Sequence, residues 1–284
     1  MHPPSNAPDP VAPATAGAWL HLHGADAVAF AQAQFCSDVA AVPPGAWQFS
    51  AWLDAQGRVR AFFHLLRTAP DDLHLLLRGG DAAALVEPLR RFVFRSRLRI
   101  AAEAPTPSLL AAVAGMAGGF VLSDDCLRLQ QGAVRLEVPL QRAALPAPEA
   151  ALAEVRAGLP RLPAATLGEL LPAWLDFERL GAISFRKGCY PGQEVAARMH
   201  FRGANSRHLQ RVRVRGAQQD PAGQVIRRED GAEAGRLLQA VALDHGSWEA
   251  LAVLRDGSTG GALWIDLPHR PDVEVLSALW RPAT

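Results

Sequence analysis

The segment RKGCYPGQEVAARMHFRG, residues 186–203, contains the only lysine and the only tyrosine of the chain, Lys187 and Tyr190. Cys189, one of three cysteines, lies between them. Of 29 basic residues, 28 are arginines, so a lysine needed only for its charge would be expected to be an arginine. Lysine differs in carrying a compact ammonium group that can lose its proton. The segment is therefore the first candidate for a functional site.

The same segment predicts a helix that begins next to the thiol. Pro191 is suited to a first helical position, where its missing N–H costs nothing. Glu194 would complement the positive end of the helix dipole, and Gly203 is a typical stop. A thiol before a helix N-terminus and beside Lys187 has a lowered pKa and is more reactive. Cys189 and Lys187 are thus the candidate reactive pair.

The alternative is that Cys189 is an inert buried residue, which is the commoner fate of a single cysteine. Two observations favour a functional loop instead. Lys187 and Tyr190 are each unique, and they fall within four positions of one another. Gly188 and Gly192 flank the cysteine, and glycine lets a backbone approach a ligand closely.

Composition limits the classes of function. The chain has 284 residues, 49% hydrophobic and 20% charged, so a substantial core is expected and global disorder is not. The net charge of +1 gives no general attraction to nucleic acid or to an anionic membrane. Three scattered cysteines without a CxxC pair argue against a structural zinc site or a cluster held by this chain alone. We expect a cytoplasmic protein with no membrane-spanning helix.

The pattern along the chain predicts an α+β body followed by an all-β domain. Residues 1–17 are proline-rich and are predicted to be a disordered tail. Residues 18–205 alternate strand and helix patterns, among them a strand over 18–24 and a helix over 24–40, with a break near 103–108. Short strands separated by glycine-bearing turns then recur through 206–284, which indicates a small β-barrel. A hairpin is expected over 47–67, with its turn at 54–57.

The octapeptide KGCYPGQE resembles the K-G-C-Y-x-G-Q-E signature of the YgfZ family of folate-binding proteins, which are related to the glycine-cleavage T-protein (GcvT). The similarity extends through GAISFRKGCYPGQEVAARMHFRGANSR, residues 181–207. GADAVAFAQAQFCSDV (24–39) resembles the N-terminal helix of the family, and LDAQGRV (53–59) resembles its hairpin turn. The resemblance covers most of residues 18–284 and is weak over 105–160.

This resemblance implies a ring of two ferredoxin-like α+β units with a C-terminal β-barrel. It also implies a tetrahydrofolate, or a one-carbon derivative of it, bound in the central opening against the signature loop. The function implied is that of an accessory protein in iron–sulfur cluster assembly or repair, which is not a classical enzyme. The expected partners are folate and iron–sulfur assembly proteins or client enzymes. The residues carried over as ligand contacts are Tyr190, Gly188, Gly192, Gln193, Glu194, Asp54 and Arg198.

The same ancestry offers an alternative, a tetrahydrofolate-dependent aminomethyltransferase-like enzyme. In the T-proteins an aspartate follows the hairpin glycine on the next strand, but residues 57–64 here contain no carboxylate. The T-proteins also carry a glutamate just before an Ala-Gly pair, where this chain has Arg156. An arginine cannot accept hydrogen bonds from a pterin, so a pterin would have to be held differently, for example by Glu154. Asp176 stands where the family often has asparagine.

Three hypotheses follow. In the first, Cys189 acts as a thiolate stabilised by Lys187, either as a transient cluster ligand or in thiol exchange with a partner. In the second, the protein is a T-protein-like transferase. In the third, it is a scaffold that binds partners through the barrel, and Cys189 is dispensable. We expect a monomer.

Four further residues have open interpretations. His21 and His23 alternate on a predicted strand and offer half a metal site, but no third ligand is visible in the sequence, so we predict no resident metal. Asp54 either shapes the hairpin turn or contacts the ligand. His200, near the end of the signature helix, either meets the glutamate tail of a folate or belongs to a solvated helix end.

Overall fold

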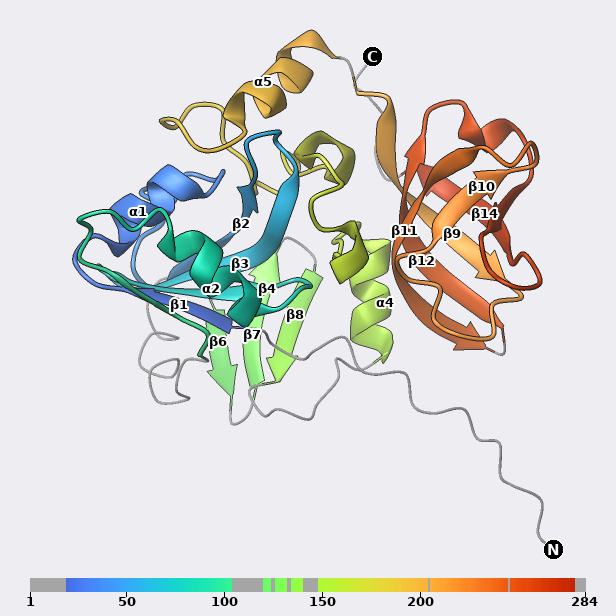
Figure 1. The fold of residues 1–284 in the computed structure, drawn as a ribbon. Coiled ribbons are helices and arrows are strands. Elements are labelled where there is room, and N and C mark those ends of the chain that lie inside the picture. Colours follow the sequence, from blue (N-terminus) through green and yellow to red (C-terminus); the bar gives the residue numbers. More distant parts are fainter. Residues whose placement is uncertain are drawn as a thin grey trace, which may run out of the picture.

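The structure, a computed structural model, describes residues 19–103, 120–123, 126–131, 134–139, 148–203, 205–244 and 246–278. The expected tail over 1–17 and most of the expected break at 103–108 lie outside these residues. Figure 1 shows the α+β body on one side and a barrel on the other, with α4 (Pro148–Arg156) between them. The α+β fold class with a C-terminal barrel is confirmed, whereas the domain boundaries stay predictions.

The N-terminal unit is built on an antiparallel five-stranded sheet with the order β2-β3-β4-β1-β5. Its strands are β1 (Trp19–His23), β2 (Ala46–Leu53), β3 (Val59–Ala69), β4 (Asp72–Leu77) and β5 (Arg99–Ala101). The predicted hairpin is formed by β2 and β3. Its strands place alternate side chains on opposite faces, so one sheet contributes to two cores.

Helices α1 (Ala27–Gln34) and α2 (Ala82–Arg90) cover one face of this sheet, in agreement with Figure 1. Leu20 and Leu22 of β1 pack there with Phe30 of α1 and Leu85 of α2. Trp19 belongs instead to the core on the opposite face. The helix predicted over 24–40 is too long, because α1 ends at Gln34, Phe35 is extended and the following residues form bends and turns.

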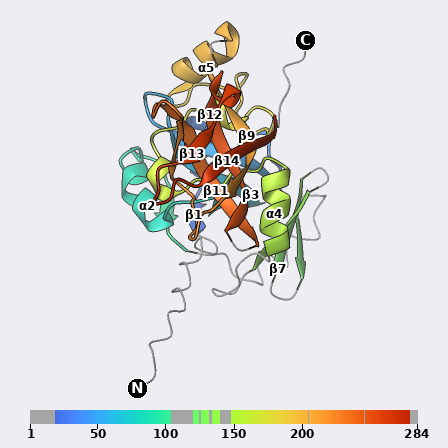
Figure 2. The ribbon, with the colours of Figure 1, turned by 90° about the vertical axis from the view of Figure 1, so that its right-hand side faces the viewer.

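The second unit contains a three-stranded antiparallel sheet followed by helices and turns. Its strands are β6 (Phe120–Ser123), β7 (Cys126–Gln131) and β8 (Val134–Pro139). After α4 come two short 3-10 turns, η1 (Ala164–Thr166) and η2 (Pro172–Leu175), and then α5 (Gln193–Arg202). In two perpendicular views α5 lies at one end of the molecule, beyond the sheets and the barrel (Figure 1, Figure 2).

The C-terminal domain is a closed six-stranded barrel with the order β10-β11-β12-β9-β14-β13. Its strands are β9 (Arg207–Arg215), β10 (Val225–Arg228), β11 (Glu233–Asp244), β12 (Ser247–Arg255), β13 (Leu263–Ile265) and β14 (Asp272–Ala278), with the 3-10 turn η3 (Ser258–Gly260) between β12 and β13. Closure leaves no free sheet edge. Within the described residues, no helix has the length and apolar character needed to cross a membrane.

One apolar core joins the body to the barrel. Phe49 and Phe62 of the sheet share this core with Leu251 and Val253 of β12. Residues of the signature region, among them Tyr190, belong to the same cluster. The barrel is thus packed against the body, and the signature segment lies within that packing.

A buried ion cluster reinforces α4 where it joins the sheet. Glu154 accepts hydrogen bonds on both carboxylate oxygens from Arg78 (3.0 and 3.4 Å) and from Arg161 (2.8 and 2.9 Å). Arg78 also donates to the carbonyls of Leu159 and Pro160 at 3.1 and 3.0 Å. Since a carboxylate offers about four acceptor positions, Glu154 is saturated and is not available to a pterin.

Arg156 connects α4 to the barrel. Its guanidinium makes two hydrogen bonds, of 3.1 and 3.2 Å, to the carboxylate of Glu249 on β12. Glu249 is buried, and Arg211 of β9 lies 3.6 Å from the same carboxylate. The residue that replaces the glutamate of the T-proteins therefore connects α4 to the barrel.

We predict that replacing Glu154 by glutamine destabilises the fold in a pH-dependent way. Burial acts to raise the pKa of Glu154, but Arg78 and Arg161 outweigh it and hold the pKa at about 2, below the ordinary 4.5. The stabilisation is complete above pH 4.5 and is lost as pH falls toward 2. Glu154→Gln should cost about 3 kcal/mol of unfolding free energy in urea at pH 7, and progressively less below pH 4.5.

Glu87→Gln is the matched control, because Glu87 forms an exposed pair with Arg90. It should change the unfolding free energy by less than about 1 kcal/mol. An equal effect of the two variants at pH 7, or a Glu154→Gln effect that is constant down to pH 2, would contradict the role of the buried cluster.

Candidate functional site

The signature segment is anchored by close contact with the hairpin turn. Gly192 has φ +76°, and a Cβ there would lie 2.4 Å from the carbonyl oxygen of Asp54 and 2.7 Å from Cα of Gly57. Gly57 has φ +74°, and its own Cβ would meet Val195 at 2.9 Å. Both positions require glycine, since any side chain would separate the two backbones. The two motifs most similar to the family thus form one structural unit.

Asp54 shapes this turn. Its Oδ1 accepts hydrogen bonds from the backbone N–H groups of Gln56 and Arg58, each at 2.9 Å. The carbonyl of Asp54 also accepts from Gly57 N at 2.9 Å. These contacts correspond to the turn-forming alternative for Asp54. Its proposed contact with a ligand is not needed to explain its presence.

Helix α5 begins two residues later than the sequence suggests. Gly192, and not the residue before Pro191, is the N-cap, and Gln193 is the first helical residue. Glu194 lies in the first turn as expected, and Gly203 ends the helix with φ +60°. Pro191 lies outside the helix because Gly192, whose conformation is left-handed, separates it from the first helical residue.

The side chain of Lys187 is hydrogen-bonded to the chain at and just after the end of α1. Its ammonium donates to the carbonyl of Gln32, to that of Phe35 at 2.5 Å and to that of Ser37 at 3.0 Å. Those three bonds use all three donors of an ammonium group. The expected stabilisation of a Cys189 thiolate by Lys187 is therefore not seen. A positive charge on C-terminal carbonyls of a helix is favourable in itself.

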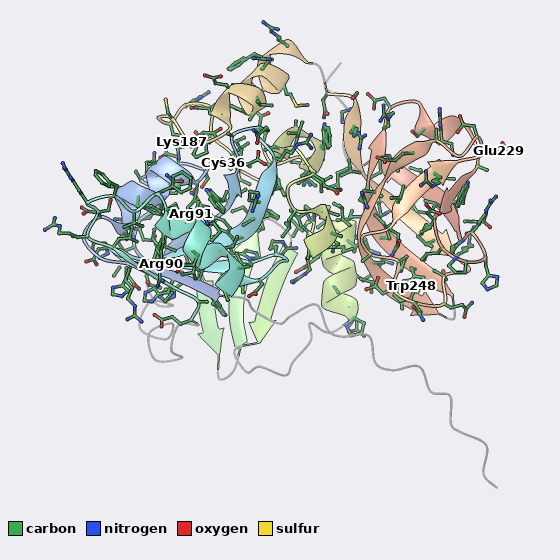
Figure 3. All side chains as sticks on the ribbon, viewed as in Figure 1. Cys36, Arg90, Arg91, Lys187, Glu229 and Trp248 are labelled. Atoms are coloured by element: carbon green, nitrogen blue, oxygen red, sulfur yellow. The ribbon has the colours of Figure 1, made fainter. Side chains whose placement is uncertain are left out.

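The surroundings of the Lys187 ammonium are almost closed to solvent. Lys187 is 9% exposed, and its Nζ lies 5.1 Å from the centroid of the Tyr190 ring. Burial lowers the pKa of Lys187 to about 8, against the opposing influence of Cys36 and Asp38. In Figure 3, Lys187 and Cys36 lie beside α1. The lone lysine is thus an internal bridge between the signature segment and the N-terminal helix.

Cys36 and Tyr190 complete the interior of this bridge. The thiol of Cys36 is fully buried and donates to Ala182 O at 3.1 Å, and burial raises its pKa to about 12. Tyr190 is buried, its pKa is raised by burial, and its hydroxyl has no hydrogen-bond partner among the described residues. The Tyr190 ring therefore packs in the core, and its hydroxyl retains hydrogen-bonding capacity.

Cys189 is on the outside of the same segment. It is exposed, and Gly188 beside it is exposed with open space around it. Glu194 and Arg198 on α5 are also exposed, and Gln193 is half-buried. Neighbouring residues of the signature thus have opposite roles, because Lys187 and Tyr190 point inward while the Cys189 thiol is accessible to a partner.

A pocket of about 590 Å³ lies beside α5. Its walls come from the segment around η2, from α5 and from the start of the barrel. It is lined by Pro172, Ala173, Asp176, Phe177, Glu178, Arg179, Ile183, Phe185, Ala196, Met199, His200, Gly203, Asn205 and His208. None of the residues carried over as ligand contacts lines it, although α5 joins them to it. His200, named from the sequence, does line it.

Asp176 is the polar residue of greatest interest in this pocket. Its side chain is 10% exposed, and its Oδ2 is buried without a hydrogen-bond partner among the described residues. Burial raises the pKa of Asp176, while the charges of Arg179, whose Nε lies 3.9 Å away, and His208 oppose that shift. Asp176 adopts a left-handed φ of 55°. Such an unsatisfied buried acceptor is suited to an N–H donor of a ligand.

Part of the pocket lining is aromatic. Phe185 stacks on His200 with ring centroids 4.2 Å apart, and His200 Nδ1 lies 3.0 Å from Glu178. On α5, Ala196, Met199, His200 and Gly203 recur at helical spacing, which places them on one face. That spacing, together with the apolar segment before the signature, is the signal from which these pocket residues could have been found.

Two known proteins are similar to this chain in sequence. A Haemophilus influenzae protein described as uncharacterized is 27% identical over an alignment of 247 residues, and the match covers 84% of this chain and 86% of that protein. The tRNA-modifying protein YgfZ of Shigella boydii is 28% identical over 260 residues, covering 79% of each protein. No family model matches the chain.

A solved structure shows the same fold. The aminomethyltransferase T of the glycine cleavage system from Bartonella henselae superposes with a TM-score of 0.58 at 16% sequence identity, covering 93% of this chain and 84% of that one. It shows a GcvT-like fold, and the similarity to the YgfZ of Shigella boydii agrees with the resemblance that the signature indicated.

We predict that Gly192→Ala destabilises the protein more than Gly181→Ala does. Both glycines have a positive φ, +76° and +65°, but a Cβ at Gly181 meets nothing within 4 Å. The shared conformational strain cancels, so the difference measures the close approach to the hairpin turn. Thermal or urea unfolding should show a difference of at least about 1 kcal/mol. Equal losses would mean that the hairpin and the signature do not pack this closely.

We predict that Lys187→Met lowers the unfolding free energy by about 2–4 kcal/mol, because it strips three carbonyls of their common donor. Lys187→Arg should be almost as harmful, since a planar guanidinium does not fit the position of the ammonium. Arg186→Met is the matched control, because Arg186 is the exposed neighbour. Urea unfolding at pH 7 measures all three. A Lys187→Met loss no larger than that of the control would refute the bridge.

Proposed function

We propose that this protein binds a tetrahydrofolate, or a one-carbon derivative of it, in the pocket beside α5, and that it assists the assembly or repair of iron–sulfur clusters through Cys189. The observation that carries the proposal is an exposed thiol just before α5 together with a pocket that α5 helps to line and that contains a buried carboxylate oxygen, Asp176 Oδ2, without a hydrogen-bond partner among the described residues. The choice of tetrahydrofolate as ligand and of iron–sulfur cluster assembly or repair as process comes from the resemblance of the signature to the YgfZ family.

The pocket fits the chemistry of a folate. A volume of about 590 Å³ is within the ordinary range for organic ligands, roughly 300–1,000 Å³. A pterin ring is flat and presents neighbouring N–H donors, which match the stacking surface of Phe185 and the free acceptor of Asp176. Binding of such donors would favour the charged form of Asp176 against the effect of burial. His200 and Arg179 at the same pocket offer positive or polar groups to an anionic tail.

Asp176 is also a candidate for the residue that accepts hydrogen bonds from the pterin, a role that neither Arg156 nor Glu154 can fill. Arg156 pairs with Glu249, and Glu154 is saturated by Arg78 and Arg161. Neither can act as the acceptor that a pterin needs. We therefore assign that role to Asp176, with Tyr190 retained as a core residue under the signature loop. Gly188, Gly192, Gln193, Glu194 and Arg198 would shape the loop and its exposed surface.

Cys189 would act on a partner and not alone. One exposed cysteine can supply one ligand to a cluster or take part in one thiol exchange, and a partner protein must supply the rest. The name of the Shigella boydii relative refers to tRNA modification. An accessory role toward an iron–sulfur enzyme that modifies tRNA would reconcile that name with a protein whose net charge is only +1.

The aminomethyltransferase alternative is less well supported. The strand that follows the hairpin glycine, β3, carries no carboxylate, and its residues from Ala61 to Leu66 are buried. A transferase of that kind would need an acid or base close to the reacting folate nitrogen. The likeness to the Bartonella henselae aminomethyltransferase is at 16% identity and shows the fold alone.

We predict that tetrahydrofolate binds the full chain and that Asp176→Ala weakens binding at least about tenfold, the loss expected for a hydrogen-bonded charge. Glu178→Ala is the control, because Glu178 lines the same pocket but is 64% exposed; it should change affinity less than about threefold. Calorimetric titration measures both. Equal effects, in variants shown to be folded, would contradict the assignment of Asp176.

The role of Cys189 is tested separately in cells that lack this protein. Wild type should restore the activity of a [4Fe–4S] enzyme under oxidative stress, and Cys189→Ala should not. Since Cys189 is exposed, its replacement should leave the thermal stability unchanged. Full rescue by Cys189→Ala would contradict the thiol role and leave folate binding or scaffolding as the function of the signature.

A further inference from the structure

We propose that His21, Asp72 and His74 form a binding site for one divalent first-row transition-metal ion. The three residues lie on the antiparallel strand pair β1 and β4, where His21 is directly opposite His74 and Asp72 is opposite His23. Side chains two residues apart on a strand share a face, so Asp72 and His74 point to the same side as His21. Two rigid, hydrogen-bonded strands thus present three metal-binding groups together.

The donor atoms are already close to one another. His21 Nε2 lies 2.6 Å from Asp72 Oδ1, and His74 Nε2 lies 3.2 Å from Asp72 Oδ2. One donor atom from each of the three side chains lies within 4.8 Å of the other two. A tetrahedral ion with ligands at about 2.0–2.2 Å holds its donors roughly 3.4 Å apart. The two imidazoles are stacked at 4.2 Å, so they need only rotate toward a common point beside the carboxylate.

A second layer of polar contacts orients these groups. The other ring nitrogen of His21, Nδ1, lies 2.8 Å from Oε1 of Glu103, just beyond β5. Thr68 donates its hydroxyl to Asp72 Oδ2. Metal-bound histidines typically donate their second N–H to a carboxylate, which fixes the ring and its tautomer. Glu103 stands in that relation to His21, and this arrangement cannot be seen in the alternation of His21 and His23.

Burial gives the cluster a dry side and an open side. The side chain of His74 is 2% exposed, and its Nδ1 has no hydrogen-bond partner among the described residues. The side chains of His21 and Asp72 are 16% and 18% exposed, so an ion could still enter from solvent. Three protein ligands with one accessible position is the arrangement of metal sites that retain a water or exchangeable ligand.

The donor set selects the class of ion. Two imidazole nitrogens and one carboxylate suit zinc or ferrous iron, whereas calcium and magnesium prefer oxygen ligands alone. None of the three residues belongs to the signature segment or lines the pocket beside α5. The proposal is therefore independent of folate binding, and either can fail without the other. The rival explanation is a hydrogen-bonded charge cluster that only ties β1 to β4 and Glu103.

The test is a calorimetric titration of the full chain, stripped with chelator, with Zn²⁺ and in a second series with Fe²⁺ under anaerobic conditions. We expect one ion per chain and a higher thermal midpoint on binding. Asp72→Asn, which preserves size, should weaken binding at least about 100-fold, and Glu103→Gln should weaken it about 10–100-fold as an outer residue. His21→Gln provides a second ligand variant at a partly exposed position.

Two variants serve as controls. His23→Ala removes the histidine that stacks on His21 but is not one of the three ligands. Cys189→Ser removes the exposed thiol, which is the obvious place for adventitious zinc. Both should bind like the wild type. No stoichiometric binding by wild type at micromolar metal would overturn the site, as would binding that survives both Asp72→Asn and His21→Gln or disappears with Cys189→Ser.

Discussion

The ammonium of Lys187 is bound by the main-chain carbonyls of Gln32, Phe35 and Ser37, and the placement of the signature segment depends on this contact. The helix α1 ends at Gln34, and Phe35 then pairs with Trp52 of β2 in an isolated bridge. Carbonyls released at a helix end need donors, and a buried cation needs acceptors. Each requirement is met by the other, across some 150 residues of chain.

Beyond Lys187, some residues of the signature segment face the core and others face the surface, with different consequences. Inward, Tyr190 joins the core that also includes strands of the barrel, so the signature helps to hold body and barrel together. Outward, Cys189 is exposed, and Gly192 brings α5 against the hairpin turn at Gly57. The next turns of α5 then reach the pocket that contains Asp176. A single loop therefore couples the fold, an accessible thiol and a cavity of ligand size.

Local patterns were enough to predict the classes of element and their order in the N-terminal unit and the barrel, but not over residues 108–160, which contain β6, β7, β8 and α4. The alternation in 18–24, the turn at 54–57 and the glycine-punctuated strands after 206 correspond to β1, the β2–β3 hairpin and the barrel.

The helix over 24–40 was predicted too long because its end is set by Lys187 and by the bridge to Trp52, which are distant in sequence. The start of α5 was misplaced because the conformation of Gly192 depends on contact with the hairpin. Lys187 was singled out as a partner of Cys189, but its hydrogen bonds are to carbonyls, which leave no trace in a sequence. For the same reason the saturation of Glu154, the free oxygen of Asp176 and the meeting of His21 with Asp72 and His74 could not be foreseen.

Because the internal, hydrogen-bonded ammonium belongs to the only lysine of the chain, it can be observed directly. Protein labelled with ¹⁵N-lysine has a single side-chain nitrogen signal, whose exchange and titration can be followed by NMR. The account predicts an ammonium protected from exchange at neutral pH, titrating near a pKa of about 8 because of its burial. A rapidly exchanging signal with an ordinary lysine pKa of about 10.4 would place Lys187 in solvent and contradict the account.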